Sequence, residues 1–403
     1  MDFDELDAFL SKPSPKGEKA GGFSSSMSLK ERFRRTMFFQ EVDVLPNFEF
    51  GYWDRTLEVW HEQGLPEHVV NEATAYEYFG IESWEMVNVN SNPMPLFKDE
   101  IIEETDDHTV YRDGYGCVAR INKHGDKSIP HFIDFPIKDR ATWEPFKAAF
   151  NPNDPKRWEG FDKSLEWVRC TDAPLGIYGG SMAGVARNLI GFQGIAMMQY
   201  EDPALLTEII NTFGATTVAV LEKALPQIQV DFCMGWEDIC FNKGPIISPD
   251  FFRAVAGPWY RRIADLLVMH GCCVYTTDTD GNIMPIAGIF LDNGMNTMFP
   301  VEVHGGSDPC ALRDKYGKRI RLWGGVNKHE LAKSKQAIDH ELEWLAPYVE
   351  QGGFIPGVDH RVPADVPLEN YLYYLDRKRE LFHVGGVPQY AREQEQEQEP
   401  CKE

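Results

Sequence analysis

Apolar and amphipathic segments alternate along the second half of the chain. Short, almost entirely apolar runs occupy residues 175–180, 230–238, 272–280, 297–303, 319–327 and 353–360. Longer segments with apolar residues at helical spacing lie between them, including residues 248–271 and 328–352. Apolar strands that alternate with helices are typical of a parallel sheet covered by helices. The pattern therefore predicts an α/β fold from about residue 174 onward.

The first half of the chain adds candidate elements to the same fold. Residues 28–40, SLKERFRRTMFFQ, predict a helix with Ser28 as its N-cap and a glutamate at the capping-box spacing. Residues 42–53 and 82–90 indicate two further strands. Residues 101–142 contain short β-rich pieces separated by DG and HGD turns, which predicts a β-hairpin insertion.

The predicted strands approach eight in number, which favours a closed (β/α)8 TIM barrel with an N-terminal helical extension. An open doubly wound sheet is disfavoured because no GxGxxG motif opens the first βα unit. Residues 1–28 mix charge with Pro, Gly and Ser and are predicted to form a disordered leader. Residues 386–403 are polar, acidic and of low complexity, and are predicted to form a disordered tail. The barrel would then comprise residues 29–385.

The composition excludes several classes of function. The 403 residues carry a formal net charge of −23 at pH 7, which would repel the phosphate backbone of a nucleic acid. No signal-peptide pattern and no run of about 18 apolar residues is evident, so membrane insertion is not expected. The eight cysteines include no CxxC pair and are interpreted as reduced structural thiols. These features predict a cytoplasmic protein that acts on a small molecule.

Polar side chains recur at the carboxyl ends of the predicted strands, where TIM barrels place their functional groups. Asp, Asn and Ser at such ends are commonly turn formers or caps, but recurring Glu, His and Lys are not explained in that way. The candidate catalytic residues are Glu237, Asp278, Asp280 and His360, and the candidate substrate-binding residues are Ser181, Asp238, Asn282, Glu302, His304 and Lys328.

Asp278 and Asp280 are two residues apart, so in a continuing strand both side chains face the same way, with Cα atoms about 6.6 Å apart. Two carboxylates at this spacing can raise the pKa of one of them and separate a proton donor from a base. Together with His360 they could instead bind a divalent metal ion such as zinc. The alternative is a turn in which Asp280 caps the following helix.

Two further strand ends favour acid–base chemistry. His360 lies on a loop that prolines hold rigid, which orients it for use as a base or ligand. Glu237 follows the apolar FCMGW, where partial desolvation would raise its pKa toward that of a general acid. Its neighbour Asp238 has a capping or turn role as the alternative.

Six stretches resemble the uroporphyrinogen decarboxylase superfamily, which includes corrinoid-linked methyltransferases. They are SLKERFRRTMFFQEVDVLP, YGGSMAGVARNLIGFQGIAMMQYEDPALL, DICFNKGPIISPDFFRAVAGPWYRRI, TDTDGNI, LWGGVNKHELAKS and GGFIPGVDHRVPADVPLENY. They occur in the family's order and cover most of the chain from Ser28 to Phe382. The resemblance implies a (β/α)8 barrel with its pocket at the carboxyl ends of the strands.

The resemblance also separates the members of the superfamily. The decarboxylase carries an Arg-rich segment after its first strand for the carboxylates of its tetrapyrrole, whereas this chain has NFEFGYWD there. Acidic and aromatic side chains cannot clamp a polyanion, so porphyrinogen decarboxylation is not expected. Thiol-activating members hold zinc through His-x-Cys and a later Cys, and these positions fall on Asp278, Asp280 and His360. His360 also falls where the decarboxylases place a pocket histidine.

Three functions follow as alternatives. The first is a methyltransferase-like enzyme that moves a methyl group between a small methylated substrate and a separate corrinoid protein. In it, Glu237, Asp278 and Asp280 would bind the substrate and protonate the leaving group, while His360 and Lys328 would orient it. The second is a cofactor-independent decarboxylase or lyase of a small carboxylic acid. The third is a non-catalytic barrel that binds a ligand.

The cofactor and assembly expectations follow from the same resemblance. The cofactor options are zinc or another divalent metal at Asp278, Asp280 and His360, a corrinoid carried by a partner protein, or no bound cofactor. The expected partners are a small-molecule substrate, the corrinoid protein and a second copy of the chain in a homodimer.

Overall fold

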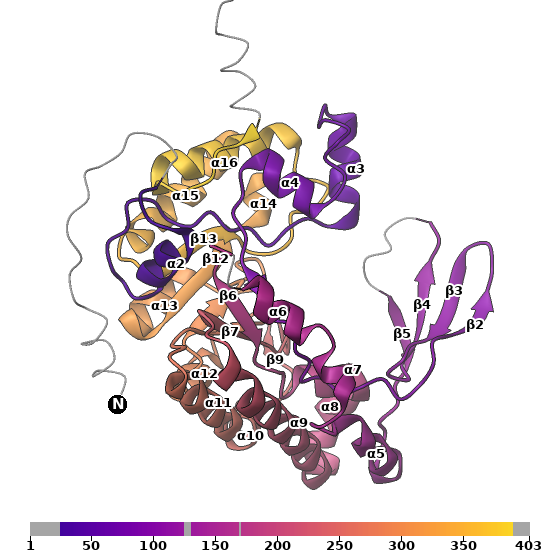
Figure 1. Ribbon diagram of the computed structural model, residues 1–403. Coiled ribbons are helices and arrows are strands. Elements are labelled where there is room, and N and C mark those ends of the chain that lie inside the picture. The colour runs from indigo at the N-terminus through magenta and orange to yellow at the C-terminus, as the bar shows by residue number, and fades with distance from the viewer. Residues whose placement is uncertain (1–24, 125–129, 169–170, 390–403) are drawn as a thin grey trace, which may run out of the picture. The chain divides into compact units, whose positions relative to one another are not determined.

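The computed structural model describes residues 25–124, 130–168 and 171–389. Most of the predicted leader and tail, residues 1–24 and 390–403, lies outside the described residues. The chain falls into two compact units, drawn in Figure 1. Unit 1 contains the described residues of Met1–Glu85, Asp172–Pro174 and Met298–Glu403, and unit 2 contains those of Met86–Thr171 and Leu175–Thr297.

Seven strands follow the hydrogen-bonded order β1-β6-β7-β10-β11-β12-β13. Their bounds are Glu85–Met86 (β1), Leu175–Tyr178 (β6), Phe232–Trp236 (β7), Tyr275–Asp278 (β10), Thr297–Phe299 (β11), Arg321–Val326 (β12) and Phe354–Val358 (β13). The pairs β6–β7, β7–β10 and β12–β13 run parallel. The predicted α/β fold with a parallel sheet is therefore confirmed.

In unit 2, the strand register sorts the side chains onto two faces. Tyr178, Met234 and Thr276 are register partners across three strands, and Trp236 is the partner of Asp278. Because alternate residues of a strand point to opposite sides, these five side chains share one face. This face matters below because it forms the wall of a cavity.

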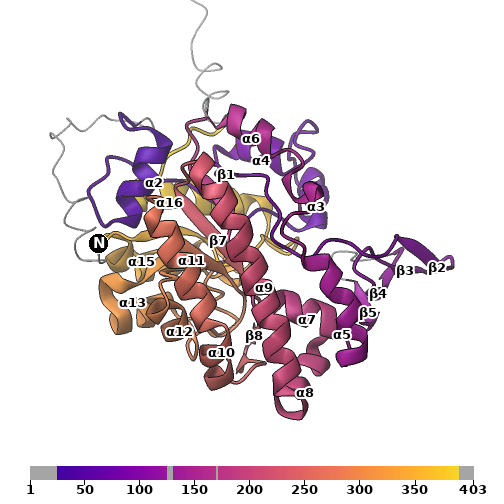
Figure 2. The same ribbon diagram turned by 60° about the horizontal axis from the view of Figure 1, so that its bottom comes forward.

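The helices of unit 2 follow its strands in the chain. They are α5 (Arg140–Phe146), α6 (Phe161–Trp167), α7 (Gly184–Ile190), α8 (Phe192–Glu201), α9 (Pro203–Ala224), α10 (Pro249–Val255), α11 (Gly257–Met269) and α12 (Ala287–Asp292), with the short 3-10 turns η1 (Lys147–Phe150), η2 (Pro155–Trp158) and η3 (Leu225–Gln227). Figure 2 shows α9 and α11 running side by side over β7. A two-stranded ribbon, β8 (Cys240–Phe241) with β9 (Gly244–Pro245), follows β7.

The predicted hairpin insertion is confirmed as a four-stranded antiparallel sheet in unit 2. Its strands are β2 (Glu100–Glu104), β3 (His108–Arg112), β4 (Val118–Asn122) and β5 (His131–Asp134). The outer strands β2 and β5 are exposed along their whole length. The sheet stands apart from β6 and β7 in Figure 1, yet the residues beside its β3–β4 turn approach the strand face described above.

Unit 1 surrounds β12 and β13 with helices from both ends of the chain. They are α2 (Leu29–Met37), α3 (Asp54–Glu62), α4 (Glu72–Phe79), α13 (Pro309–Tyr316), α14 (Lys328–Leu331), α15 (Lys335–Val349) and α16 (Leu368–Phe382), with the turn η4 (Gly317–Arg319). The predicted N-cap of α2 is confirmed, because the Ser28 hydroxyl accepts from the backbone N–H of Glu31 at 3.1 Å.

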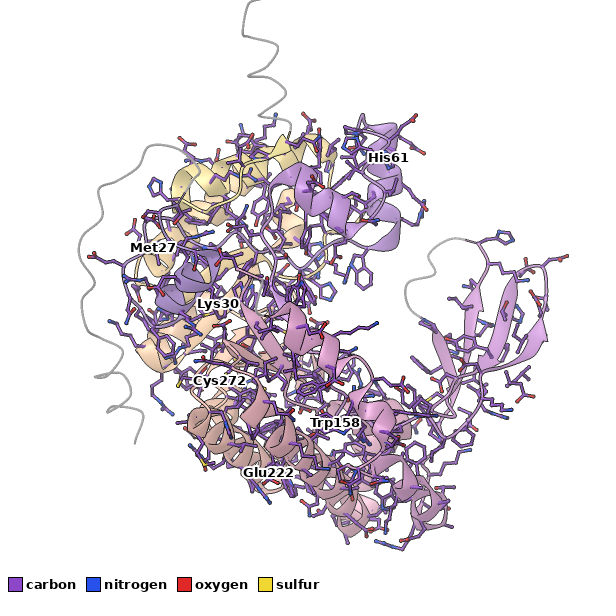
Figure 3. All side chains as sticks on the ribbon, viewed as in Figure 1. Met27, Lys30, His61, Trp158, Glu222 and Cys272 are labelled. Atoms are coloured by element: carbon purple, nitrogen blue, oxygen red, sulfur yellow. The ribbon has the colours of Figure 1, made fainter. Side chains whose placement is uncertain are left out.

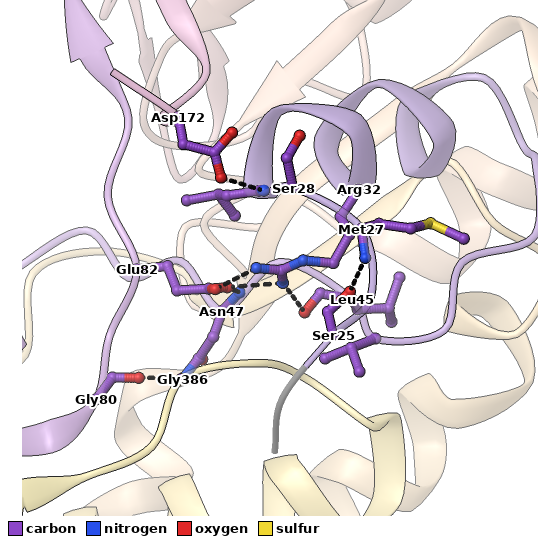
Figure 4. A network of polar contacts seen from close by, with 12 residues as sticks. Ser25, Met27, Ser28, Arg32, Leu45, Asn47, Gly80, Glu82, Asp172 and Gly386 are labelled. Carbon is purple, nitrogen blue, oxygen red and sulfur yellow. Dashed lines mark hydrogen bonds and ion pairs between the residues drawn. The ribbon is translucent and has the colours of Figure 1, made fainter. Parts of the chain in front are cut away.

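A buried polar network attaches α2 to the segment that follows it (Figure 4). The Arg32 guanidinium forms an ion pair with Glu82, whose carboxylate also accepts from the Asn47 backbone N–H at 2.9 Å. The Asn47 side-chain amide donates to the Gly80 carbonyl at 3.0 Å. One guanidinium therefore fixes the residues that enter the predicted first strand.

That first strand is an extended segment with isolated bridges rather than a regular strand. Tyr52 forms a parallel bridge with Val362, and the Val362 N–H donates to the Gly51 carbonyl at 2.9 Å. The Trp53 N–H donates to the Val362 carbonyl at 3.1 Å. The segment thus pairs with residues just after β13, where an eighth strand would lie. The closed eight-stranded barrel itself stays a prediction.

One helix differs from the expectation that no segment is apolar enough to cross a membrane. The stretch Pro203–Gln227, which contains α9, meets that criterion by length and composition. More than half of its apolar window is buried inside the protein, as in the core helix of a globular fold. The feature is weak support for membrane insertion.

A buried ion pair joins α16 to the extended segment of unit 1. The Lys378 ammonium lies 2.5 Å from the Glu49 carboxylate, and both side chains are fully buried. Burial lowers the pKa of Lys378, and the Glu49 charge opposes that shift. Glu49 also accepts from the Tyr374 hydroxyl at 2.7 Å and from the Val358 N–H at 2.8 Å. The pair therefore ties the extended segment to both β13 and α16.

Lys378→Met should destabilise the protein by about 3–5 kcal/mol, because removing one partner leaves the Glu49 charge buried without its cation. Urea unfolding followed by tryptophan fluorescence measures the loss. Lys335→Met is the matched control, because Lys335 forms an exposed pair with Glu369 at 3.6 Å and should cost less than about 1 kcal/mol. Equal losses in the two variants would contradict the role assigned to the buried pair.

Candidate functional site

The predicted site residues form two groups, one in each unit. Ser181, Glu237, Asp238, Asp278, Asp280 and Asn282 belong to unit 2, and Glu302, His304, Lys328 and His360 belong to unit 1. Each of them ends a strand of the parallel sheet or lies in the segment that follows one, as predicted. Their hydrogen bonds and ion pairs, however, indicate different roles for the individual residues.

A cavity of about 490 Å³ lies in unit 2 over the strand face described above. Tyr178, Met234, Trp236 and Asp278 supply its wall from β6, β7 and β10. The rest of the lining comes from α7, from the insertion and from β1 and the segment after it, namely Met86, Asn92, Pro93, Asp113, Tyr115, Cys117, Phe132, Val185, Asn188 and Leu189. A concave, mostly apolar site with few polar groups is the usual form of a small-molecule site.

The charged side chains in the described lining of this cavity are of one sign. Asp113 and Asp278 line it, and none of the described lining residues is Lys, Arg or His. Burial, followed by the negative charge of Glu237, raises the pKa of the Tyr178 hydroxyl, which also has a hydrogen bond with Asn92. Tyr178 therefore stays a neutral phenol. The cavity offers aromatic faces and carboxylates to a ligand.

Glu237 is fully buried, and its carboxylate accepts hydrogen bonds from backbone N–H groups. It accepts from the N–H groups of Met182, Ala183 and Gly184 at 2.7–2.9 Å, and from the Tyr260 hydroxyl on α11. Burial raises the pKa of the Glu237 carboxyl, and these donors oppose the rise. Glu237 is thus placed as a positioning residue that holds the start of α7, in contrast to the general-acid role expected from the sequence.

Close packing at this point requires a glycine. A Cβ at position 184 would lie 2.1 Å from the Glu237 carbonyl oxygen, which no side chain can tolerate. The MAGVARN sequence therefore brings the first turn of α7 directly against the end of β7. The Ser181 hydroxyl accepts from the Val185 N–H at 2.9 Å, so Ser181 helps to hold the first turn of α7.

Asp238 lies in a second polar cluster with Arg187 and Asp280. The Asp238 backbone has a φ of 48°, and its carboxylate pairs with the Arg187 guanidinium at 3.2 Å. The Asp280 N–H donates to the Asp238 carboxylate at 3.2 Å. Burial, then the charge of Asp280, raises the pKa of the Asp238 carboxyl. Asp238 thereby fixes the chain reversal after β7.

The helix-capping alternative for Asp280 is wrong. The next helix, α12, begins at Ala287, and its N-cap Ile286 has no side-chain cap. Asn282 instead forms a local turn, in which its side-chain oxygen accepts from the Met284 N–H at 3.1 Å. Of the two aspartates, Asp278 lines the cavity, whereas Asp280 lies with Asp238.

In unit 1, Asp359 has the same role as Glu237. It accepts from the backbone N–H groups of Val303 and Lys328 at 2.8 and 2.9 Å. The Lys328 ammonium is paired with Glu302 at 2.9 Å. Burial raises the pKa of the Asp359 carboxyl to about 6, against the charge of Lys328. The predicted residues Lys328 and Glu302 thus form one ion pair beside a buried carboxylate.

The two predicted histidines of unit 1 pack against rings. His360 stacks on Trp53 with ring centroids 5.2 Å apart, and its Nδ1 accepts from the Arg361 N–H at 2.8 Å. That bond places the proton of the neutral ring on Nε2. His304 lies 4.1 Å from His329, and burial, then the His304 charge, lowers the pKa of His329.

The donor set does not fit a metal ion. Within residues 25–389, apart from the gaps named above, no three His, Cys, Asp or Glu side chains form a metal-binding group. The six described cysteines are buried. Burial raises the pKa of the Cys233 thiol well above its usual value and that of Cys240 to about 12, so neither is a ready thiolate ligand.

These features define an α/β protein whose parallel strands end at a cavity of the size a small molecule requires. A family profile described as uroporphyrinogen decarboxylase (URO-D) matches residues 86–381. The chain therefore belongs to the uroporphyrinogen decarboxylase family. Among solved structures, a methyltransferase from Methanosarcina mazei is similar with a TM-score of 0.58 and 18% identity, over 89% of this chain and all of that chain. This likeness shows the fold alone. A search of the curated proteins found no match.

Several functional residues lay outside the sequence prediction. Tyr178 ends β6 and could have been found by the same strand-end rule, which considered only charged and small polar residues. Arg187 and Tyr260 lie within helices, 51 and 23 residues from the acids they contact. The residues Tyr115 and Phe132 come from the insertion, and no sequence pattern connects them to the strands.

Glu237→Gln should lower the free energy of unfolding by about 2 kcal/mol or more, because an amide N–H₂ would face the backbone N–H donors at the start of α7. Glu222→Gln, at an exposed position of α9 labelled in Figure 3, is the control and should change stability by less than about 0.5 kcal/mol. Urea unfolding measures both. A Glu237→Gln protein that is fully stable but inactive would restore a catalytic role.

Asp359 should make the stability of the protein depend on pH. Its folded-state pKa of about 6 exceeds the unfolded value of 3.8, so its favourable contribution is present below pH 3.8 and is lost as pH rises through 6. Between pH 4.5 and pH 7.5 the unmodified protein should lose about 2 kcal/mol of stability relative to Asp359→Asn. Urea unfolding at both pH values measures the difference. A difference that stays constant would refute the shift.

Proposed function

We propose that this chain is a methyltransferase-like enzyme that moves a methyl group between a small methylated substrate and a separate corrinoid protein. The observation that carries the proposal is the unit 2 cavity, whose aromatic wall contains the Asp278 carboxylate and no cationic side chain among the described residues. Family membership and the fold of the methyltransferase from Methanosarcina mazei support it.

The same cavity argues against the reaction that gives the family its name. A porphyrinogen carries several carboxylates, and sites for such anions use Arg or Lys to pair with them. The lining offers Asp113 and Asp278 in their place. A carboxylic acid substrate would meet like charges, so decarboxylation of a small acid is the weaker alternative.

The proposed step breaks the bond between the methyl carbon and a heteroatom of the substrate. The electron pair of that bond stays on the heteroatom, and the methyl group passes to the corrinoid of the partner, which supplies the nucleophile. Asp278 would hold the substrate by charge or hydrogen bond, and Tyr178 and Trp236 would orient it within the wall. Glu237 would keep α7 in place. No step uses a metal ion bound by this chain.

We further propose that the fold closes as a (β/α)8 barrel. The support is the extended segment at Gly51–Trp53, which exchanges backbone hydrogen bonds with Val362 just beyond β13. The side chains of Phe48 and Glu49, which directly precede this segment, are buried. A segment paired and buried in this way supports an eighth strand at this edge.

Asp278→Asn should lower kcat/KM for methyl transfer by about 100-fold, because the substitution removes the one strand-borne carboxylate in the cavity wall. The assay supplies cob(I)alamin, or a purified corrinoid protein, as methyl acceptor. The donors are a panel of methylated amines, thioethers and aryl ethers. The cobalamin absorbance spectrum reports the transfer.

Asp265→Asn on the exposed face of α11 is the matched control and should retain full activity, because its side chain is 65% exposed. Failure of every donor with both acceptors, together with carbon dioxide release from a small carboxylic acid, would replace methyl transfer with decarboxylation. Full activity of Asp278→Asn would remove the cavity from the mechanism.

A further inference from the structure

We infer that the unit 2 cavity recognises a methylated cation, a quaternary ammonium or sulfonium compound, through its methyl-bearing positive centre. The inference rests on the proposed function and specifies its substrate class. It follows from two properties of the cavity, its aromatic faces and the sign of its charges. The chemistry of the group that leaves the substrate agrees with them.

The aromatic faces come from separate parts of unit 2. Tyr178 and Trp236 lie on adjacent strands, and Tyr115 and Phe132 come from the insertion. Ring faces carry negative potential and attract cations, and a cation without N–H groups gives up little hydration when it binds them. Trp236 already shows this preference, because the Arg187 guanidinium lies 5.2 Å from its ring centroid.

The charges near the cavity favour a cation as well. Asp278 and Asp113 line the wall, and the Asp113 carboxylate accepts from the N–H groups of Tyr115 and Cys117 at 2.9 Å, which fixes its position. Arg187 does not line the cavity, and its charge is matched by Asp238. Fixed carboxylates beside aromatic faces, with no compensating cation in the described lining, leave a site of net negative potential.

The chemistry of the departing group agrees with this assignment. When a methyl group leaves a quaternary nitrogen or a sulfonium sulfur, the bonding electron pair stays behind and the product is a neutral amine or sulfide. No proton is needed to balance the charge. A neutral ether would instead leave as an alkoxide that requires an acid, and Glu237, the expected acid, is occupied by backbone donors.

Binding of choline and of its neutral carbon isostere to the full chain tests the inference. In the isostere a quaternary carbon replaces the nitrogen, so shape is kept and only the charge is lost. Titration calorimetry should give choline at least tenfold tighter binding than the isostere, and tetramethylammonium should compete with choline. Equal affinity for choline and the isostere, or no binding of either cation, would overturn the inference.

Variants separate charge from packing. Asp278→Asn should weaken choline binding about tenfold and leave the isostere unchanged, whereas Asp265→Asn should alter neither. Tyr178→Leu removes a ring face from the wall and should weaken choline selectively. Unchanged choline binding by both Asp278→Asn and Tyr178→Leu, in proteins with unaltered urea unfolding, would also overturn the inference.

These experiments distinguish failure of the cation site from failure of the proposed methyl transfer. If choline binds selectively but no donor transfers a methyl group, the cation site stands and methyl transfer fails. If a neutral methylated donor is turned over while choline and its isostere bind alike, methyl transfer stands and the cation site fails.

Discussion

The Glu237 carboxylate sets the geometry on which the cavity of unit 2 depends. It collects three backbone N–H groups at the start of α7 and the Tyr260 hydroxyl from α11. The first N–H groups of a helix have no partner within the helix, and a buried carboxylate needs donors in place of water. The carboxylate and the N–H groups at the start of α7 therefore supply the hydrogen-bond partners that each of them needs. The end of β7 and the loop after β6 therefore converge on one charge, and the wall residues Tyr178 and Trp236 are held in fixed positions.

Unit 1 uses the same arrangement twice. Asp359 collects the backbone N–H groups that follow β11 and β12, and Glu49 collects one from β13. Acids at the ends of parallel strands are thus the means by which both units satisfy loops that would otherwise bury unpaired N–H groups. Acids such as Asp278, which line a cavity instead, are the exception, and that difference separates ligand recognition from support of the backbone.

The sequence was sufficient for most of the strands, the insertion and the cap of α2, because periodicity, turn residues and the spacing of Ser28 and Glu31 are local signals. It also located the strand ends at which the candidate residues lie. It could not separate Asp278 from Asp280 or Glu237, because their roles depend on partners such as Tyr260 that are distant in the chain. The positive φ of Asp238 turns the backbone after β7, so the alternation of a continuing strand no longer applies there.

The composition of the cavity wall decides which substrates the family fold can accept in this chain. Arginines would stabilise carboxylates, and thiolates would hold a soft metal ion, but the wall offers ring faces and fixed acids. An anion entering it would lose its hydration without gaining a counter-charge, which is a large penalty in a site of low polarity. A cation without N–H groups loses little hydration and gains from every face. If the proposed cation site is correct, the same fold changes its preferred charge through its lining residues alone, while the buried acids that position the strands remain in use.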